Sequence, residues 1–95
     1  MSIIDNNSYL YLAEVRSVSL FKLSSVLVGQ HVVIQGITAE DGVRQRMEAM
    51  GLRAGREACV VRSARLGGPI QIRVGSISLI LRRRDAELVH VVPVA

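Results

Sequence analysis

The sequence has very few aromatic residues and no tryptophan. Its aromatic side chains are Tyr9, Tyr11 and Phe21, so none occurs from Lys22 to the end. Small barrels that hold single-stranded nucleic acid stack bases on aromatic side chains, each worth about 1–3 kcal/mol. Domains that capture proline-rich peptides likewise need aromatic-lined grooves. The absence therefore argues against both kinds of binding by the part of the chain that follows Lys22.

Cysteine and long apolar stretches are equally scarce. Cys59 is the only cysteine, so no internal disulfide can form, which agrees with a reducing compartment. Hydrophobic residues make up 49% of the 95 residues, yet no run reaches the roughly 20 apolar residues that cross a bilayer. Polar residues 5–8 interrupt the stretch that a secretory signal would need. We therefore expect one soluble, cytoplasmic domain without direct membrane insertion.

Positive charge is unevenly placed and is carried almost wholly by arginine. Twelve basic and eight acidic residues give 12 − 8 = +4. Residues 41–95 contain ten arginines and five acidic residues (+5), whereas residues 1–40 sum to −1. Lys22 is the only lysine. Because the planar guanidinium fork suits carboxylates and phosphates, an acidic protein surface and a nucleic acid backbone are both open as partners.

Short alternating segments separated by glycine and proline predict a mainly β domain. Ile70, Ile72 and Val74 alternate with polar residues and should share an inward face, while residues 77, 79 and 81 should do so after a two-residue hairpin link. The expected strands cover residues 31–36, 57–62, 70–74, 77–81 and 88–92. Five such strands favour a small closed or partly closed β-barrel, with one short α-helix inserted after the first strand.

That helix is expected over residues 41–50. Val43, Met47 and Met50 follow the i, i+4, i+7 spacing of one apolar stripe. Gly51 stands where a left-handed residue ends a helix, and Leu52 can fold back onto the stripe. A single further helical turn is expected within residues 82–88.

Residues 1–20 are predicted to be an N-terminal extension of uncertain structure, and residues 21–95 the barrel domain. Residues 9–15 fit a short strand or a short helix equally well. The extension either docks on the domain through Tyr9, Tyr11 and Phe21 or is a loosely ordered leader.

No combination of residues predicts catalysis. The segment Gly67-Gly68-Pro69 lacks the lysine and the following helix of a phosphate-binding loop, so we expect a β-turn there. The serines have no histidine and acid partner near them in sequence. We therefore expect a protein that is not an enzyme and has no cofactor.

Several motifs in the same order resemble the FeoA family, small cytoplasmic proteins of bacterial ferrous-iron uptake. The resemblance covers roughly residues 23–92, and its motifs lie at 44–52, Gly55, 66–70, 73–74 and 79–89. It implies an SH3-like β-barrel that acts as an accessory to the membrane ferrous-iron permease FeoB, which has a cytoplasmic GTP-binding domain. The run Arg82–Arg84 is more basic than is usual for the family.

A similar barrel forms the C-terminal domain of iron- and manganese-responsive repressors. Only about 22 residues precede the barrel here, too few for a helix-turn-helix domain with its dimerisation helices. A stand-alone accessory is therefore favoured, located in the cytoplasm and attached to the inner membrane only through its partner. Homo-oligomer formation is left open.

Four arginines on the helix and in the turn after it are the predicted partner-binding residues. They are Arg44, Arg46, Arg53 and Arg56. Their guanidinium groups suit the carboxylates of an acidic partner. The alternative is that they only solvate one face and pair locally, for example Arg44 with Glu48. Outward-facing Val61 and Ile80 would add apolar area for partner docking or self-association.

Two other functions stay open. The first is a nucleic-acid-binding barrel, suggested by the charge of residues 41–95, although no nucleic acid is expected because aromatic platforms are missing. The second is a regulator that binds Fe²⁺ through His31, His90 or Cys59. A ferrous or zinc site needs three or four ligands, and these residues show no ligand spacing, so we predict surface histidines and no metal site. The two histidines could approach each other if the first and last strands are neighbours.

Overall fold

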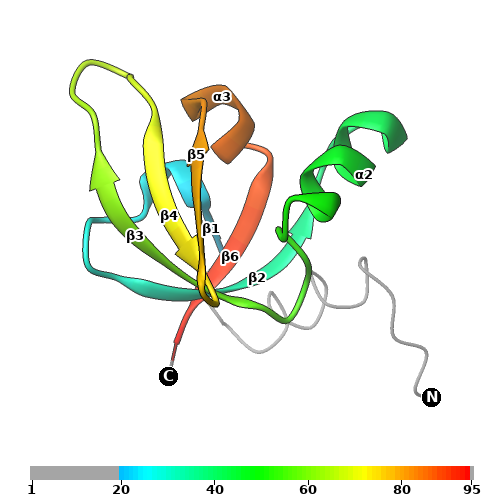
Figure 1. Cartoon of the computed structure of the whole chain (residues 1–95), viewed down its shortest axis with the longest axis horizontal. Helices are drawn as coiled ribbons and strands as arrows, with labels where there is room; N and C mark the ends of the chain where they lie inside the picture. The colour runs from blue at the N-terminus through cyan, green and yellow to red at the C-terminus, as the bar shows by residue number, and fades with distance from the viewer. Residues whose placement is uncertain (1–19, 95) are drawn as a thin grey trace.

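Six antiparallel strands form one curled sheet in the computed structural model, which describes residues 20–94 (Figure 1). The strands are β1 (Phe21–Lys22), β2 (His31–Ile37), β3 (Glu57–Ser63), β4 (Ile70–Val74), β5 (Ile77–Leu81) and β6 (Val89–Pro93). Their order across the sheet is β1-β6-β2-β3-β4-β5. The predicted mainly β fold with five strands is confirmed, and the sheet also includes β1. A strand of two residues is too short to show any alternation in the sequence.

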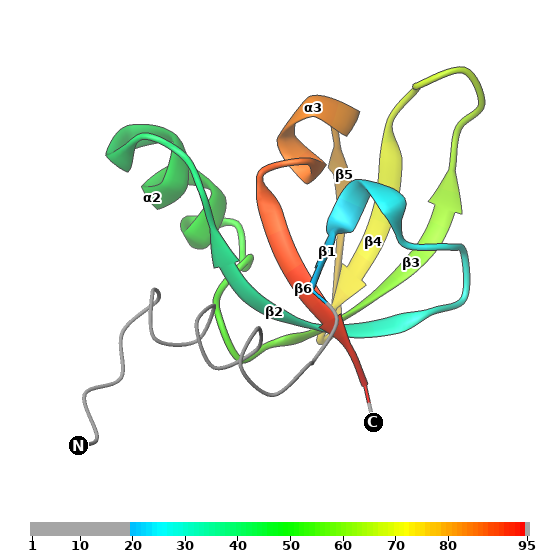
Figure 2. The ribbon, with the colours of Figure 1, turned by 180° about the vertical axis from the view of Figure 1, so that it is seen from behind.

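Residues 20–94 also include three short helical segments. They are the 3₁₀ helix η1 (Leu23–Ser25) and the α-helices α2 (Asp41–Ala49) and α3 (Arg83–Ala86). Figure 2, seen from behind, shows β1 and η1 beside β6. Helix α2 follows β2, which is the first of the predicted strands, so its predicted place along the chain is confirmed.

Helix α2 is terminated, as predicted, by a glycine in the left-handed conformation. Gly51 has φ +116° and its N–H donates to the Glu48 carbonyl at 3.0 Å. The Leu52 N–H donates to the Met47 carbonyl at 3.2 Å. These two bonds form a Schellman motif, which turns the chain so that Leu52 becomes fully buried.

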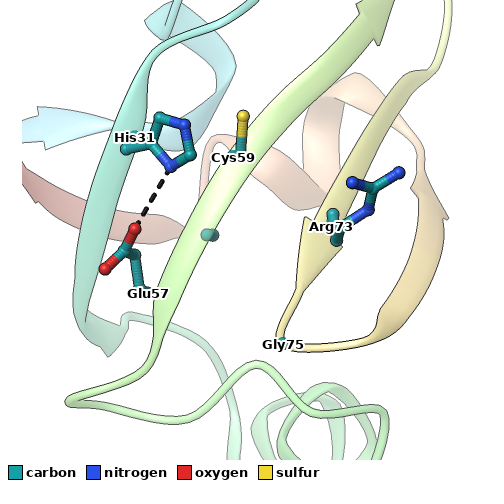
Figure 3. A pocket seen from close by; sticks show the side chains of 6 residues that line it. His31, Glu57, Cys59, Arg73 and Gly75 are labelled. Carbon is teal, nitrogen blue, oxygen red and sulfur yellow. Dashed lines mark hydrogen bonds and ion pairs between the residues drawn. The ribbon is translucent and has the colours of Figure 1, made fainter.

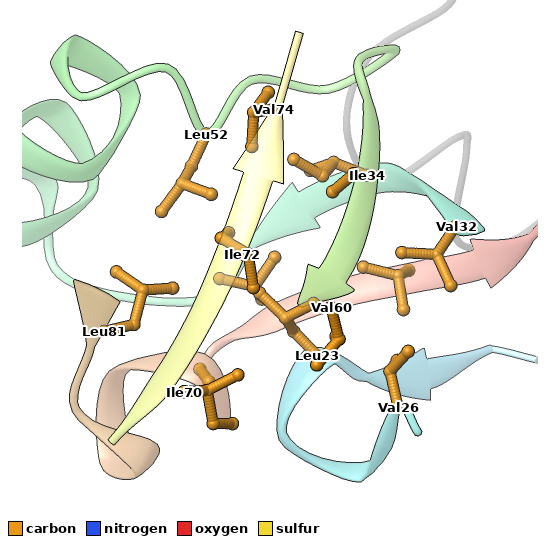
Figure 4. Packing of buried hydrophobic residues seen from close by; sticks show 14 of the residues in the cluster. Leu23, Val26, Val32, Ile34, Leu52, Val60, Ile70, Ile72, Val74 and Leu81 are labelled. Atoms are coloured by element: carbon orange, nitrogen blue, oxygen red, sulfur yellow. The ribbon is translucent and has the colours of Figure 1, made fainter. Parts of the chain in front are cut away.

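Alternate residues of the strands supply the core (Figure 4). Ile70, Ile72 and Val74 of β4 are buried, as their alternation predicts. Leu23 from η1 and Leu52 from the helix exit complete this core from outside the sheet. Each fully buried aliphatic side chain contributes about 1.5–3 kcal/mol. No charged or polar side chain is buried within residues 20–94, so the core there consists only of apolar side chains, aliphatic residues and Met47.

Strand β5 departs from the predicted burial. Residues 77, 79 and 81 do share a face, but only Leu81 is buried, and Ile77 is 47% exposed. The reason is that β5 is at the edge of the sheet and pairs only with β4. Alternation identifies which residues share a face of a strand, not whether another layer covers that face.

The division into residues 1–20 and 21–95 stays a prediction, because residues 1–19 lie outside the described part of the chain. The same holds for the choice between strand and helix at residues 9–15 and for docking through Tyr9 and Tyr11. Among residues 20–94, no helix has the length and apolar character needed to cross a membrane.

Candidate partner-binding surface

Arg44 is held by an ion pair within α2. Its guanidinium Nη2 lies 3.0 Å from Oδ1 of Asp41, one helical turn earlier. The side chain is partly buried, and the pair is of a kind that contributes only about 0.3–0.5 kcal/mol. Arg44 therefore does pair locally, as the alternative prediction has it, but its partner is Asp41 and not Glu48. Because Asp41 already forms an ion pair with the Arg44 guanidinium, Arg44 has less free capacity to bind a carboxylate of a partner.

Arg46 extends from a different side of α2. Residues two apart on an α-helix point roughly 200° from each other, so Arg44 and Arg46 do not share one helix face. Between them the apolar stripe faces the core, with Met47 buried and Val43 packed against it. Arg46 is exposed and forms no ion pair with any residue from 20 to 94.

Arg53 and Arg56 lie in the loop that joins α2 to β3. The Nε of Arg53 donates to the Glu48 carbonyl at 3.3 Å, at the negative end of the helix dipole. The loop itself is fixed to β2, because the Gly55 N–H donates to Ile34 at 2.8 Å and the Ile34 N–H donates to Arg56 at 2.9 Å. Both guanidinium groups are thus exposed on a backbone that is held in place.

A shallow hollow of about 190 Å³ lies on the outer face of the sheet (Figure 3). His31 Nδ1 lies 3.1 Å from Glu57 Oε2 at its edge, and both side chains are more than half exposed. Cys59 is directly opposite His31 in the β2–β3 ladder. Figure 3 shows its sulfur away from the line between the imidazole and Glu57. The hollow is smaller than the roughly 300–1,000 Å³ of most small-molecule pockets.

The two histidines lie far apart. Strands β2 and β6 are neighbours, but His90 pairs with Gly36, five positions along β2 from His31. At about 3.3 Å per residue, this separates the two by roughly 16 Å. The Nε2 of His90 instead lies 2.7 Å from the Thr38 hydroxyl. Throughout residues 20–94, no three histidine, cysteine or acidic side chains are grouped so that they could hold a metal ion.

The structure also exposes one large apolar residue, Leu66, that the sequence did not single out, and it exposes Ile80 as predicted. Leu66, in the loop between β3 and β4, is fully exposed, and Ile80 on β5 is 71% exposed. Val61, the other residue predicted to face outward, is half-buried at a bulge in β3, and β4 separates it from β5. A leucine just before Gly67-Gly68 was the one available signal, because apolar residues are unusual at the tip of a tight turn.

The family model and the similar solved structures both point to the FeoA family. Residues 21–93 match the family model described as the FeoA domain. The FeoA protein from Chlorobium tepidum, solved by NMR in solution, is 35% identical with a TM-score of 0.73, covering 79% of this chain and 71% of that one. FeoA from Stenotrophomonas maltophilia, solved with zinc and described as an SH3 domain protein, is 25% identical with a TM-score of 0.66, covering 75% and 88%.

A repressor has the same fold at lower sequence identity. A manganese-dependent transcriptional repressor is 17% identical with a TM-score of 0.74 over 81% of this chain and 43% of that one. At this identity the likeness shows the fold alone. The S. maltophilia structure, described as an SH3 domain protein, confirms that the predicted fold is SH3-like.

Proposed function

Because this chain belongs to the FeoA family, we propose that it is a non-enzymatic accessory of bacterial ferrous-iron uptake that binds the cytoplasmic part of a FeoB-type permease. The family match over residues 21–93 is the observation that carries this proposal. The S. maltophilia relative is described as a candidate activating factor of ferrous-iron transport. A cytoplasmic location follows from this role, with the membrane reached through the permease.

The α2 surface supplies the chemistry that such binding needs. Arg46, Arg53 and Arg56 are exposed and form no ion pair with any residue from 20 to 94. Arginine is enriched at the residues that dominate protein interfaces, because its fork binds carboxylates through two parallel hydrogen bonds. We assign these three, with Arg44 in a lesser role because Asp41 shares its charge, to contacts with acidic residues of the permease.

Nucleic acid binding is the weaker function for this surface. It offers positive charge, but the chain has no aromatic residue from Lys22 onward on which bases could stack. The Fe²⁺ sensor is also disfavoured, because His31 and His90 lie on well-separated parts of the β2–β6 ladder.

Titration of this chain against the purified cytoplasmic region of the permease tests the proposal. We expect saturable binding that weakens as salt is raised, because arginine–carboxylate contacts at the rim of an interface are screened. Full-length permease in detergent is the second target. Failure of the chain to bind either target at low salt would refute the proposal.

A further inference from the structure

We propose that the β3–β4 loop and the adjoining α3 form a second, peripheral docking face for the anionic headgroups of a membrane, with Leu66 as its apolar tip. This face is distinct from the α2 surface, and the inference does not depend on permease binding. It involves no membrane-spanning element.

Leu66 occupies a backbone conformation that leucine disfavours. Its φ is +59° and that of Gly67 is +75°, and the Gly68 N–H donates to the Arg65 carbonyl at 3.2 Å. Two central residues with positive φ define a type I′ turn, in which asparagine, aspartate and glycine are preferred. Leu66 is the only residue other than glycine with positive φ among residues 20–94.

No contact within the domain explains this leucine, because its side chain is fully exposed. A strained residue with no internal contact indicates that the side chain serves a role outside the fold. An apolar tip surrounded by water would gain most by entering an apolar environment.

The loop that carries Leu66 is held in a fixed shape. The Ala64 N–H donates to the Pro69 carbonyl at 3.0 Å, closing the loop at its base. Arg83 reaches across from α3 and donates to the carbonyls of Gly68 and Ala64, each at 3.3 Å, and to that of Ser24 at 3.2 Å. Arg83 is therefore a positioning residue. Figure 1 shows this loop and α3 projecting at the same end of the molecule.

The surroundings of Leu66 are strongly cationic. Residues 58–84 contain six arginines and no acidic residue. Besides the inward-turned Arg83, the exposed arginines near the loop and α3 are Arg62, Arg65, Arg82 and Arg84. None of them forms an ion pair with a residue from 20 to 94, although Asp85 and Glu87 are close in sequence. Beside the loop, a hollow of about 230 Å³ lined partly by Pro69 and Ile80 extends the apolar area.

A protruding apolar tip ringed by arginines fits an anionic bilayer better than an acidic protein. A bilayer interface accepts such a tip without a matching pocket, and its phosphates accept hydrogen bonds from the guanidinium fork. Each basic residue near an anionic leaflet strengthens binding by about fivefold. A protein partner would instead need a cavity shaped to Leu66.

Co-sedimentation of the full chain with lipid vesicles tests the inference. We expect binding to vesicles that mix phosphatidylglycerol into phosphatidylcholine, decreasing as salt is raised, and little binding to phosphatidylcholine alone. Equal binding to the two compositions, or no binding to the anionic vesicles at low salt, would overturn it.

Leu66→Asn separates the role of the side chain from the fold. Asparagine suits the type I′ turn, so the variant should unfold at the same or a higher temperature while vesicle binding weakens about tenfold or more. Leu27→Asn, at an exposed leucine outside this loop, is the matched control and should bind as the parent does. Unchanged vesicle binding by Leu66→Asn would rule out the apolar tip.

Charge variants complete the design. Arg62→Gln and Arg65→Gln should each weaken vesicle binding about fivefold, whereas Arg56→Gln, just before the opposite end of β3, should leave it unchanged. Should Leu66→Asn abolish binding to the permease region while vesicles are never bound, the loop would belong to a protein interface and the membrane assignment would be wrong.

Discussion

One glycine inside α2 and one just after it show how the same residue type has opposite effects at two positions. Gly51 ends the helix with φ +116°, a conformation that residues with a Cβ rarely adopt, whereas Gly42 lies inside the first turn without positive φ. Apart from the neighbouring residues and the backbone of the helix itself, a Cβ added at either position would meet no heavy atom within 4 Å. If alanine at these two positions changes the free energy of unfolding differently, the cause must therefore be the backbone conformation and not steric crowding.

Gly51→Ala should lower the free energy of unfolding by about 1–2 kcal/mol, because alanine is disfavoured in the left-handed region. Gly42→Ala should raise it by about 0.5–1 kcal/mol, because alanine is the better helix former. Urea unfolding followed by circular dichroism measures both. If the two variants change stability in the same direction, the assignment of Gly51 as the left-handed helix terminator is wrong.

Single residues also show where sequence reasoning reaches its limit. The glycine exit of α2 was predictable, because it depends on neighbours within one turn. The separate roles of Arg82, Arg83 and Arg84 were not, because three identical residues in a row give no signal of which one turns inward. Whether Arg44 pairs with Asp41 or Glu48 was likewise a matter of rotamers, since both acids lie within helical reach.

At the scale of elements, α3 is the clearest example of a short helix stabilised by its contacts. Four residues are too few for a helix to be stable alone. Arg83 links α3 to the β3–β4 loop and to η1 through hydrogen bonds of 2.9–3.3 Å, the shortest to the Ser63 hydroxyl. These three segments are thus fixed to one another largely through one guanidinium group.

Arg83→Met should lower the free energy of unfolding by about 1–2 kcal/mol, because it removes charge-assisted hydrogen bonds and leaves partly buried carbonyls without their donor. The matched change Arg84→Met, at an exposed neighbour, should stay within about 0.5 kcal/mol. Thermal and urea unfolding of the pair measure the difference. Equal stabilities for the two variants would show that Arg83 does not hold these segments together.

The strands themselves were largely predictable, and their arrangement was not. Alternation predicted β4 residue by residue, since Ile70, Ile72 and Val74 need only a covered inner face. The exposure of Ile77 depends on β5 being at an edge. The separation of His31 from His90 depends on register between β2 and β6. Strands β2 and β6 are far apart in the sequence, so the alternation within either strand does not reveal how the two pair or which strand lies at an edge.

At the scale of the whole molecule, seven of the eight exposed arginines of residues 20–94 belong to two groups, and Arg73 belongs to neither. One consists of Arg46, Arg53 and Arg56 on α2 and its following loop, and the other surrounds Leu66. The two proposals together predict that the molecule binds two anionic partners at once. A permease in an anionic membrane would present both, and docking to the two together would raise the effective affinity above either alone.

One comparison tests the central claim most directly: binding of the permease's cytoplasmic region by the double variants Arg46→Glu/Arg53→Glu and Arg62→Glu/Arg65→Glu. Both reverse two exposed arginines, so their change in net charge is identical. We predict that the first weakens binding at least about tenfold through like-charge repulsion with acidic residues of the partner, and that the second leaves it within about twofold. The account would be contradicted if the first variant bound the permease region as the parent does, or if the second variant lost more affinity than the first.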